Sequence, residues 1–347
     1  MEHHGKSSEG LAQTSIESAR RRQISSRVPR AWFHCYPSLS ICVDSALRKN
    51  LTLAPLNAVA RLLVYFVGTL LIGALLAPVL FWAAEWLADH YLFAGLGKFD
   101  FESFFHRALL VAAVGLLWPL LRSFRIRRMS DLELEPNPKW SRHVLTGFAL
   151  AAVPLLCAGA ALIAFHVFSL RITITWLAFA KIAAASIAVP VIEEAFFRGL
   201  ILGVLWRSGG KYLSILLTSA LYSIVHFLKA PPNTSVTVTW TSGFNSIAHS
   251  FSQFADPLLL AAGFTTLFFI GLVLADARLS TSSLWLPIGL HSGWIFVNGV
   301  FGKIARREMV VPPWLGKNLL VGIVPLAIVC LTWGLMRGWL KYGVRKT

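Results

Sequence analysis

Two adjacent carboxylates interrupt a long stretch of the sequence that is otherwise free of acidic residues. The chain has 16 aspartates and glutamates, yet only Glu193 and Glu194 occur between Glu135 and Asp256. They lie in the segment Val-Ile-Glu-Glu-Ala-Phe-Phe-Arg-Gly, whose other members are mostly apolar. Ionisable groups in such surroundings cost free energy, so a pair retained there indicates function.

The helical positions of the two glutamates predict different roles. Glu194 and Arg198 are four residues apart, so they share one helix face and can form an ion pair. Glu193 points about 100° away and remains available as a general base. A purely structural ion pair would explain Glu194 and Arg198, but it leaves Glu193 unexplained.

Two histidines are expected at the depth of Glu193. His226 and His291 lie in two later apolar stretches. Counted from the basic residue at the predicted cytoplasmic flank of each span, Glu193, His226 and His291 lie 14, 15 and 13 residues away. The flanking residues are Arg207, Lys211 and Arg278. At ~1.5 Å per residue, each candidate lies roughly 20 Å from its flank. The three side chains are therefore predicted to meet in one polar cavity.

The composition indicates what kind of protein positions these side chains. The chain has 347 residues, of which 56% are hydrophobic and 14% charged, with a formal net charge of +16. Soluble domains carry roughly 25% charged residues, and several apolar stretches here approach the ~20 residues that span a bilayer. The four cysteines form no Cys-x-x-Cys pattern, so neither a disulfide framework nor a thiolate metal site is expected. The sequence therefore predicts an all-α, polytopic transmembrane helical bundle of about eight spans, without nucleic-acid binding.

The expected spans are roughly 62–84, 105–121, 144–169, 174–206, 212–229, 257–277, 283–302 and 318–338. Pro190 interrupts the fourth, so a kink or break is expected there. Four regions follow along the chain. They are a basic, flexible tail at 1–53, accessory transmembrane helices at 54–171, a core with the carboxylates and histidines at 172–303, and a C-terminal helix with a basic tail at 304–347.

Lysine and arginine in the short loops predict the orientation of this multi-pass chain. Most of them fall on one side of an eight-span chain, which places both termini in the cytoplasm. These residues are Arg20–Arg22, Arg122, Arg125, Arg127, Arg128, Arg207, Lys211, Lys341, Arg345 and Lys346. One loop disagrees, because four basic residues fall on the predicted outer side: Lys303, Arg306, Arg307 and Lys317.

The order of the motifs resembles a known family. It consists of Glu-Glu-x-x-x-Arg at 193–198, an aromatic residue four positions before a histidine (Tyr222 and His226), and a later helix with His291. This set resembles the CAAX-protease and bacteriocin-processing family of intramembrane peptidases, also called the ABI or type II CAAX prenyl endopeptidase family. The resemblance covers about 172–303 and implies hydrolysis of a peptide bond within the membrane.

The resemblance also implies roles for individual residues. Glu193 would activate water, and Glu194 and Arg198 would complete the first motif. His226 would position the water or stabilise the developing oxyanion, and His291 would belong to the third motif.

Two positions depart from the family's pattern. Tyr222 stands where the family usually has phenylalanine, and Ile295 stands where it often has asparagine. Asn298 is the nearest replacement, but it lies ~10 Å along the helix from His291 rather than ~6 Å. Asn298 is therefore a weak candidate for the oxyanion donor, and Ser292 and Trp294 are alternatives.

The resemblance leaves the cofactor open, because members are described as metal-dependent or as glutamate peptidases. A zinc ion would take Glu193, His226 and His291 as ligands, with water in the open position. Glu193 would then no longer be the free base, and Glu194 is a weaker proton acceptor when paired with a cation. The residues therefore favour a glutamate mechanism without cofactor, with zinc as the alternative.

The leading hypothesis is an intramembrane endopeptidase that acts on a membrane-embedded or lipid-modified protein or peptide. One alternative is a non-proteolytic membrane scaffold or self-immunity protein of the same fold. The other is a proton-coupled transporter that uses the acid pair and the histidines as a relay. The expected partners are the substrate and the lipid bilayer.

Overall fold

The computed structural model describes residues 40–132, 134, 138–171, 175–227, 237–255, 257–308, 314–315 and 319–343. The chain divides into two units, Met1–Leu51 and Thr52–Thr347. Residues 1–39 of the predicted flexible tail lie outside the described residues, and helix α2 begins at Ser40.

Helices make up nearly all of the described chain. The long ones are α2 (Ser40–Asp89), α3 (Phe101–Ser123), α4 (Trp140–Ala164), α5 (Trp176–Glu194), α7 (Lys211–Phe227), α10 (Thr265–Thr281), α11 (Trp285–Ile304) and α12 (Ile323–Gly343). The short ones are α6 (Leu202–Ser208), α8 (Ser242–Ser250) and α9 (Pro257–Leu259). Two π-helical segments cover Ala195–Ile201 and Leu260–Phe264, and 3-10 turns cover Ala94–Lys98, Met129–Leu132 and Phe251–Ala255. The predicted all-α class is confirmed.

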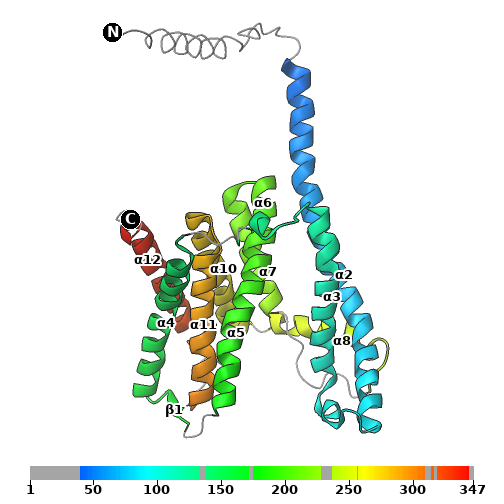
Figure 1. Ribbon diagram of the computed structural model, residues 1–347, viewed down its shortest axis with the longest axis vertical. Coiled ribbons are helices and arrows are strands. Elements are labelled where there is room, and N and C mark those ends of the chain that lie inside the picture. The colour runs from blue at the N-terminus through cyan, green and yellow to red at the C-terminus, as the bar shows by residue number, and fades with distance from the viewer. Residues whose placement is uncertain are drawn as a thin grey trace, which may run out of the picture. The chain divides into compact units, whose positions relative to one another are not determined.

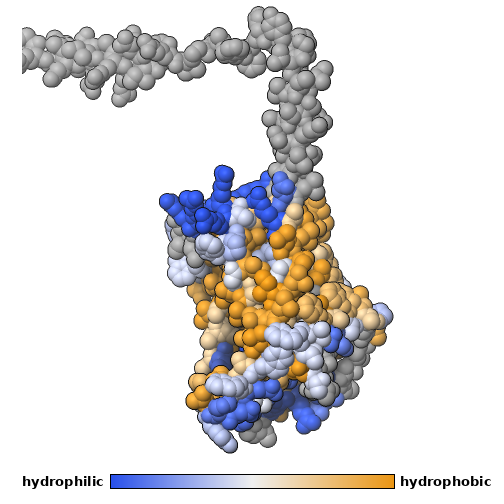
Figure 2. Space-filling view, turned by 90° about the vertical axis from the view of Figure 1, so that its right-hand side faces the viewer, coloured by the Kyte–Doolittle hydropathy of each residue, from blue (hydrophilic) through white to orange (hydrophobic). Residues whose placement is uncertain are grey.

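Within the described residues, five helical segments are long and apolar enough to cross a membrane. They are Asn57–Asp89, Phe101–Ser123, Trp140–Ala164, Leu260–Thr281 and Ile323–Tyr342. Helices α5, α7 and α11 are not among them; α5 carries Lys181 besides its two glutamates, and α7 has 17 residues. On the face seen in Figure 2, apolar residues form a band between hydrophilic ends. The chain is therefore an integral membrane protein with a polytopic helical bundle.

Helix α11 is the centre of the packing. It lies between α4 and α5, while α10 packs against α7 and α12 (Figure 1). Two glycines allow the close crossing of α11 with α4. A Cβ at Gly293 would lie 2.6 Å from the carbonyl oxygen of Phe148, and a Cβ at Gly289 would overlap the carbonyl of Val144. Gly289 and Gly293 form the Gly-x-x-x-Gly spacing that lets membrane helices approach closely.

The helix that contains Pro190 departs from the expectation. Helix α5 continues through Pro190 to Glu194, so the expected break at the proline does not occur there. The regular helix changes into the π-helix Ala195–Ile201 only after the two glutamates. Such π-helical turns are frequent at functional sites, and here the wider turn follows directly after the acid pair.

A 3-10 turn lies against this π-helix. The backbone of Leu132 limits the space at Gly199, where a Cβ would lie 3.0 Å from its carbonyl oxygen. The carboxylate of Asp131 accepts hydrogen bonds from the backbone N–H groups of Arg127 and Arg128, each 2.9 Å long. These bonds favour the ionised form and lower the pKa of Asp131 below its usual range.

Two three-residue strands were not predicted. β1 (Phe168–Leu170) follows α4, and β2 (Ala305–Arg307) follows α11 directly. They pair antiparallel, with Ser169 opposite Arg306. The pairing ties the ends of α4 and α11 together.

Candidate active site

Glu194 is completely buried and belongs to an ion-pair network. Its Oε1 accepts a hydrogen bond from Nη1 of Arg198 at 2.8 Å, and both side chains have 0% exposure. The same oxygen lies 2.8 Å from Nδ1 of His291 on α11. The predicted pairing of Glu194 with Arg198 is confirmed, and the link to His291 extends it to a second helix.

Arg198 is held by several groups besides Glu194. Its guanidinium lies 4.4 Å from the ring centroid of Tyr222, in cation–π geometry. Its Nη2 approaches the carbonyl oxygen of Gly271 on α10 at 3.4 Å. In turn, Nε of Arg278 donates to the carbonyl oxygen of Arg198 at 3.2 Å. Arg198 therefore connects the π-helix with α7 and α10.

Glu193 points away from this network, as its helical position predicts. Its Oε2 lies 3.2 Å from Nε2 of His226 and 3.8 Å from Nε2 of His291. Glu193 and His226 keep 25% and 27% of their side-chain surface exposed, whereas His291 keeps 6%. The structure thus brings the three predicted side chains together, and Glu193 is the carboxylate that a substrate could reach.

The hydrogen-bond partners of the histidines determine where their protons lie. Nδ1 of His226 is 2.9 Å from the carbonyl oxygen of Tyr222, which can only accept, so Nδ1 carries a proton. Neutral His226 would then present a lone pair to Glu193. Contact between Nε2 and the carboxylate at 3.2 Å requires one further proton, which the pair Glu193–His226 must share.

The proton of His291 is placed in the same way, by the hydrogen-bond partner of its Nδ1. Oε1 of Glu194 is a carboxyl oxygen that accepts from Arg198, so it accepts from Nδ1 of His291 as well, and Nε2 of the neutral ring carries a lone pair. The hydroxyl of Tyr222 lies 3.5 Å from this Nε2. The ring of Tyr222 also packs against that of His226, with 4.1 Å between centroids. Tyr222 therefore contacts both histidines.

Comparison with known proteins finds a family match in the part of the chain that holds these side chains. Residues 174–297 match the family described as type II CAAX prenyl endopeptidase Rce1-like. This segment belongs to that family. No curated protein and no solved structure matches the chain.

The Rce1-like segment contains the whole side-chain cluster. Glu193, Glu194, Arg198, His226 and His291 all lie within 174–297. That family consists of proteases, so the match supports a peptidase family for this segment. The roles of the individual side chains belong to the proposal below.

Asn298 lies one residue beyond the Rce1-like match and belongs to a different environment. It lines a cavity of about 270 Å³ beside β1 and β2. Its Oδ1 is buried and has no hydrogen-bond partner among the described residues. Nε1 of Trp294 is likewise buried without a partner there. The position of Asn298 in this cavity favours a role other than oxyanion donor.

The fit of a metal to the Rce1-like site can be tested on its donor atoms. Among the described residues, no group of three or more His, Cys, Asp or Glu side chains is arranged to hold a metal ion. Nδ1 of both histidines is already engaged, and Nε2 of each faces Glu193. These donor atoms do not form a metal site among the described residues, and the cofactor-free mechanism stays a prediction.

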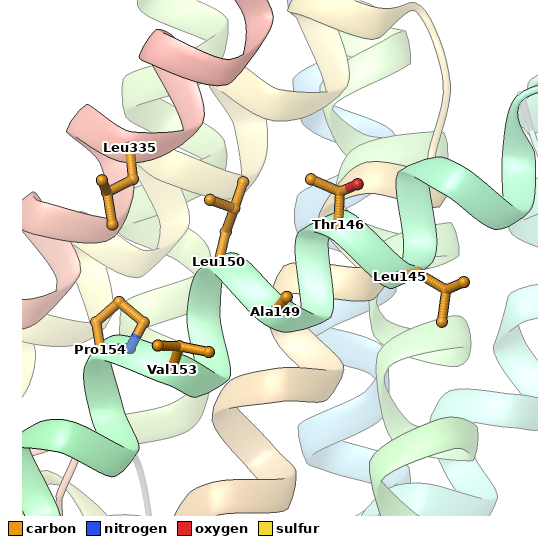
Figure 3. A pocket seen from close by; sticks show the side chains of 7 residues that line it. All are labelled: Leu145, Thr146, Ala149, Leu150, Val153, Pro154 and Leu335. Atoms are coloured by element: carbon orange, nitrogen blue, oxygen red, sulfur yellow. The ribbon is translucent and has the colours of Figure 1, made fainter. Parts of the chain in front are cut away.

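A larger cavity, of about 480 Å³, is lined by none of the candidate site residues. Figure 3 shows that its side chains come from α4, except for Leu335 of α12, and that Thr146 is the one polar group among those labelled. Its lining residues are Leu145, Thr146, Ala149, Leu150, Val153, Pro154 and Leu335. A cavity without titratable groups offers no acid or base, so it does not compete as the active site.

Two features of the Rce1-like segment were missed by sequence reasoning. The Gly-x-x-x-Gly spacing at 289–293 brackets His291 and was a readable signal for the crossing with α4. Arg278 served only as a flank for counting depth, yet it is buried and contacts the backbone of Arg198. Nothing in its local sequence indicates that contact.

Proposed function

We propose that the chain is an intramembrane endopeptidase in which Glu193 activates the attacking water. The observation that carries this proposal is the difference between the two carboxylates. Glu194 is fully buried and its Oε1 is bonded to both Arg198 and His291, whereas Glu193 is partly exposed and faces two imidazoles. A general base needs access to water and a proton-accepting form, and Glu193 has both features.

The proposed reaction involves two proton transfers at Glu193. A water bound beside Glu193 attacks the peptide carbonyl carbon while its proton passes to the carboxylate. The C–N bond of the tetrahedral intermediate then breaks, and protonated Glu193 returns the proton to the leaving amine. The products are a new carboxylic acid and a new amine, between which a proton then passes to give carboxylate and ammonium, and Glu193 is regenerated.

His226 stabilises the charge that develops in this reaction. In this proposal Nε2 of His226 carries the proton, so Glu193 stays a proton acceptor and His226 is a donor beside the tetrahedral intermediate. Fixed donors aimed at a developing oxyanion give large rate effects in a site of low dielectric. The backbone bond to Tyr222 keeps the ring in one orientation, which preserves that geometry.

Tyr222 is proposed as a second donor to the oxyanion. Its hydroxyl lies within the same cluster, 3.5 Å from Nε2 of His291. Its single proton, directed at Nε2 of His291 in the free site, would turn to the oxyanion, where Ile295 offers no hydrogen-bonding group. The tyrosine thereby compensates for the residue that departs from the family's pattern.

The proposed substrate is a membrane-embedded or lipid-modified protein or peptide. Membrane-length helices in the chain and the protease family of its core support this class. We also infer that both termini face the cytoplasm, as the basic loops predict. A reporter fused after Thr347 should be active only on the cytoplasmic side.

The activity is tested with purified chain and tagged membrane proteins of its own host. Cleavage in water enriched in oxygen-18 should place the isotope in each new C-terminal carboxylate, which mass spectrometry detects. Glu193→Gln should give no such termini, while the exposed control Glu85→Gln should match the wild type. Termini that appear equally with Glu193→Gln would contradict the proposal and favour a scaffold or self-immunity protein.

A further inference from the structure

A second polar cavity lies outside the proposed active site. It is formed where β1 and β2 join the ends of α4 and α11, and its volume is about 270 Å³. Three arginines, an asparagine and several apolar side chains line it. The residues that matter here are Arg171, Arg306, Arg307, Asn298, Phe168 and Phe301. We call it the arginine cavity.

Backbone pairing fixes the arginines of this cavity. Arg306 and Arg307 belong to β2, whose register sets them opposite Ser169 and Phe168. The backbone N–H of Arg171 donates to the carbonyl oxygen of Ile304 at 2.7 Å. The side chains of Arg171 and Arg306 are exposed. Three guanidinium groups are thus gathered on a short, hydrogen-bonded platform.

The charged side chains that line the arginine cavity are all basic. No aspartate or glutamate is among its lining residues. The nearest acid in sequence, Glu308, accepts a hydrogen bond from the hydroxyl of Ser169. Asn298 adds a buried Oδ1 without a partner among the described residues. The cavity therefore offers a ligand the positive charge of the exposed Arg171 and Arg306 and one amide oxygen, Oδ1 of Asn298.

The position of the cavity favours a ligand at the membrane surface. Helix α4 is of membrane length, and α11 with its 20 residues measures about 30 Å, the thickness of the hydrocarbon core. β2 follows α11 without a gap, so the arginines lie where lipid headgroups are expected. Phe168 and Phe301 add apolar walls beside them, which suit the glycerol and the first methylenes of a lipid.

A headgroup site also explains an exception in the charge pattern. Lys303, Arg306 and Arg307 follow the span expected from sequence at 283–302, on the side where the positive-inside rule predicts few basic residues. Basic pockets between membrane helices bind anionic headgroups. A binding role would keep these residues regardless of the topology signal.

We propose that the arginine cavity binds the phosphate headgroup of an anionic phospholipid. Arg171 and Arg306 donate to the phosphate oxygens, in the paired geometry that guanidinium groups favour. Arg307 adds positive charge, and the amide of Asn298 contacts the polar part of the glycerol. The proposal concerns a site separate from Glu193 and does not depend on peptidase activity.

The test measures binding of dioleoyl phosphatidylglycerol to the full chain in a nonionic detergent. Native mass spectrometry counts the bound lipid, and phosphatidylcholine serves as the uncharged comparison. The wild type should bind phosphatidylglycerol at least about tenfold more tightly than phosphatidylcholine. Arg171→Gln with Arg306→Gln should abolish that preference, whereas the control Arg127→Gln with Arg128→Gln should keep it. Equal preference in both double variants would overturn the proposal.

A second variant blocks the cavity without changing charge. A Cβ atom at Gly302 meets nothing within 4 Å, and the same holds for Gly338 on α12. Gly302→Leu should therefore fold normally and weaken phosphatidylglycerol binding, while Gly338→Leu should have no effect. Unchanged binding by Gly302→Leu would contradict the site.

Soluble anions distinguish a lipid site from a general phosphate site. Inorganic phosphate and glycerol phosphate are added as competitors at millimolar concentration. A lipid site should release little phosphatidylglycerol under these conditions. Complete displacement by inorganic phosphate would overturn the assignment to lipid.

Discussion

Removal of the Arg198 charge is the perturbation whose effect on the free energy of unfolding can be worked out most directly. Arg198→Ala removes the hydrogen bond of 2.8 Å to Glu194 in an environment where both side chains have 0% exposure. The carboxylate of Glu194 would keep only the contact with Nδ1 of His291. A buried charge that loses its partner typically costs about 3–5 kcal/mol. The folded-to-unfolded ratio should fall by roughly two to nearly four powers of ten.

An exposed ion pair of the same kind supplies the matched control. Arg337 on α12 contacts Asp276 at 2.6 Å, but its side chain is 59% exposed. Arg337→Ala should cost at most about 1 kcal/mol, as exposed pairs do. Unfolding in mixed dodecylmaltoside and SDS micelles, followed by tryptophan fluorescence, compares the two variants.

A second substitution tests whether the uncompensated charge of Glu194 causes the loss of stability in Arg198→Ala. Adding Glu194→Gln to Arg198→Ala removes the buried charge, so part of the lost stability should return. Residues in one network usually show coupling energies of about 0.5–3 kcal/mol. Equal stability of Arg198→Ala and Arg337→Ala, or no recovery in the double variant, would refute the assignment of Glu194 and Arg198 to a buried structural pair.

Three further outcomes follow from the structure. Gly293→Ala should destabilise the fold by about 1–3 kcal/mol, because its Cβ would lie 2.6 Å from the carbonyl oxygen of Phe148; thermal unfolding should leave Gly302→Ala, on the same helix, unchanged. Tyr222→Phe should fold normally and lower the cleavage rate by about 10²-fold, as the loss of an oxyanion donor does; an unchanged rate would remove Tyr222 from the reaction. Protein prepared in metal-free buffers should cleave without added zinc and resist chelators; chelator-sensitive activity that zinc restores would instead make Glu193, His226 and His291 ligands.

Features that depend on regular helix geometry could be predicted from the sequence. The spacing of four residues predicted the contact between Glu194 and Arg198 because side chains at that spacing share a helix face. Counting 1.5 Å per residue brought Glu193, His226 and His291 to one level. Both predictions needed only the fixed rise and rotation of a helix.

Features that depend on the rotation and contact of separate elements could not be predicted in this way. The depth of His291 says nothing about whether its Nδ1 faces Glu193 or Glu194. The π-helix Ala195–Ile201 has no local sequence signature, and the helix does not break at Pro190. Strands of three residues, such as β1 and β2, are too short for a period of two to be recognised. The arginine cavity depends on that pairing and was visible only as an exception among basic loops.

The most direct test of the account is the effect of Glu193→Gln on cleavage of a membrane substrate. The rate is measured with wild type, Glu193→Gln and the exposed control Glu85→Gln at equal amounts of folded protein in proteoliposomes. Glutamine keeps the shape of the side chain but cannot accept the proton of water, so the rate should fall by at least about 10²-fold, the usual contribution of a general base. The control should keep the wild-type rate. A rate for Glu193→Gln within tenfold of wild type would contradict the assignment of Glu193 as the base.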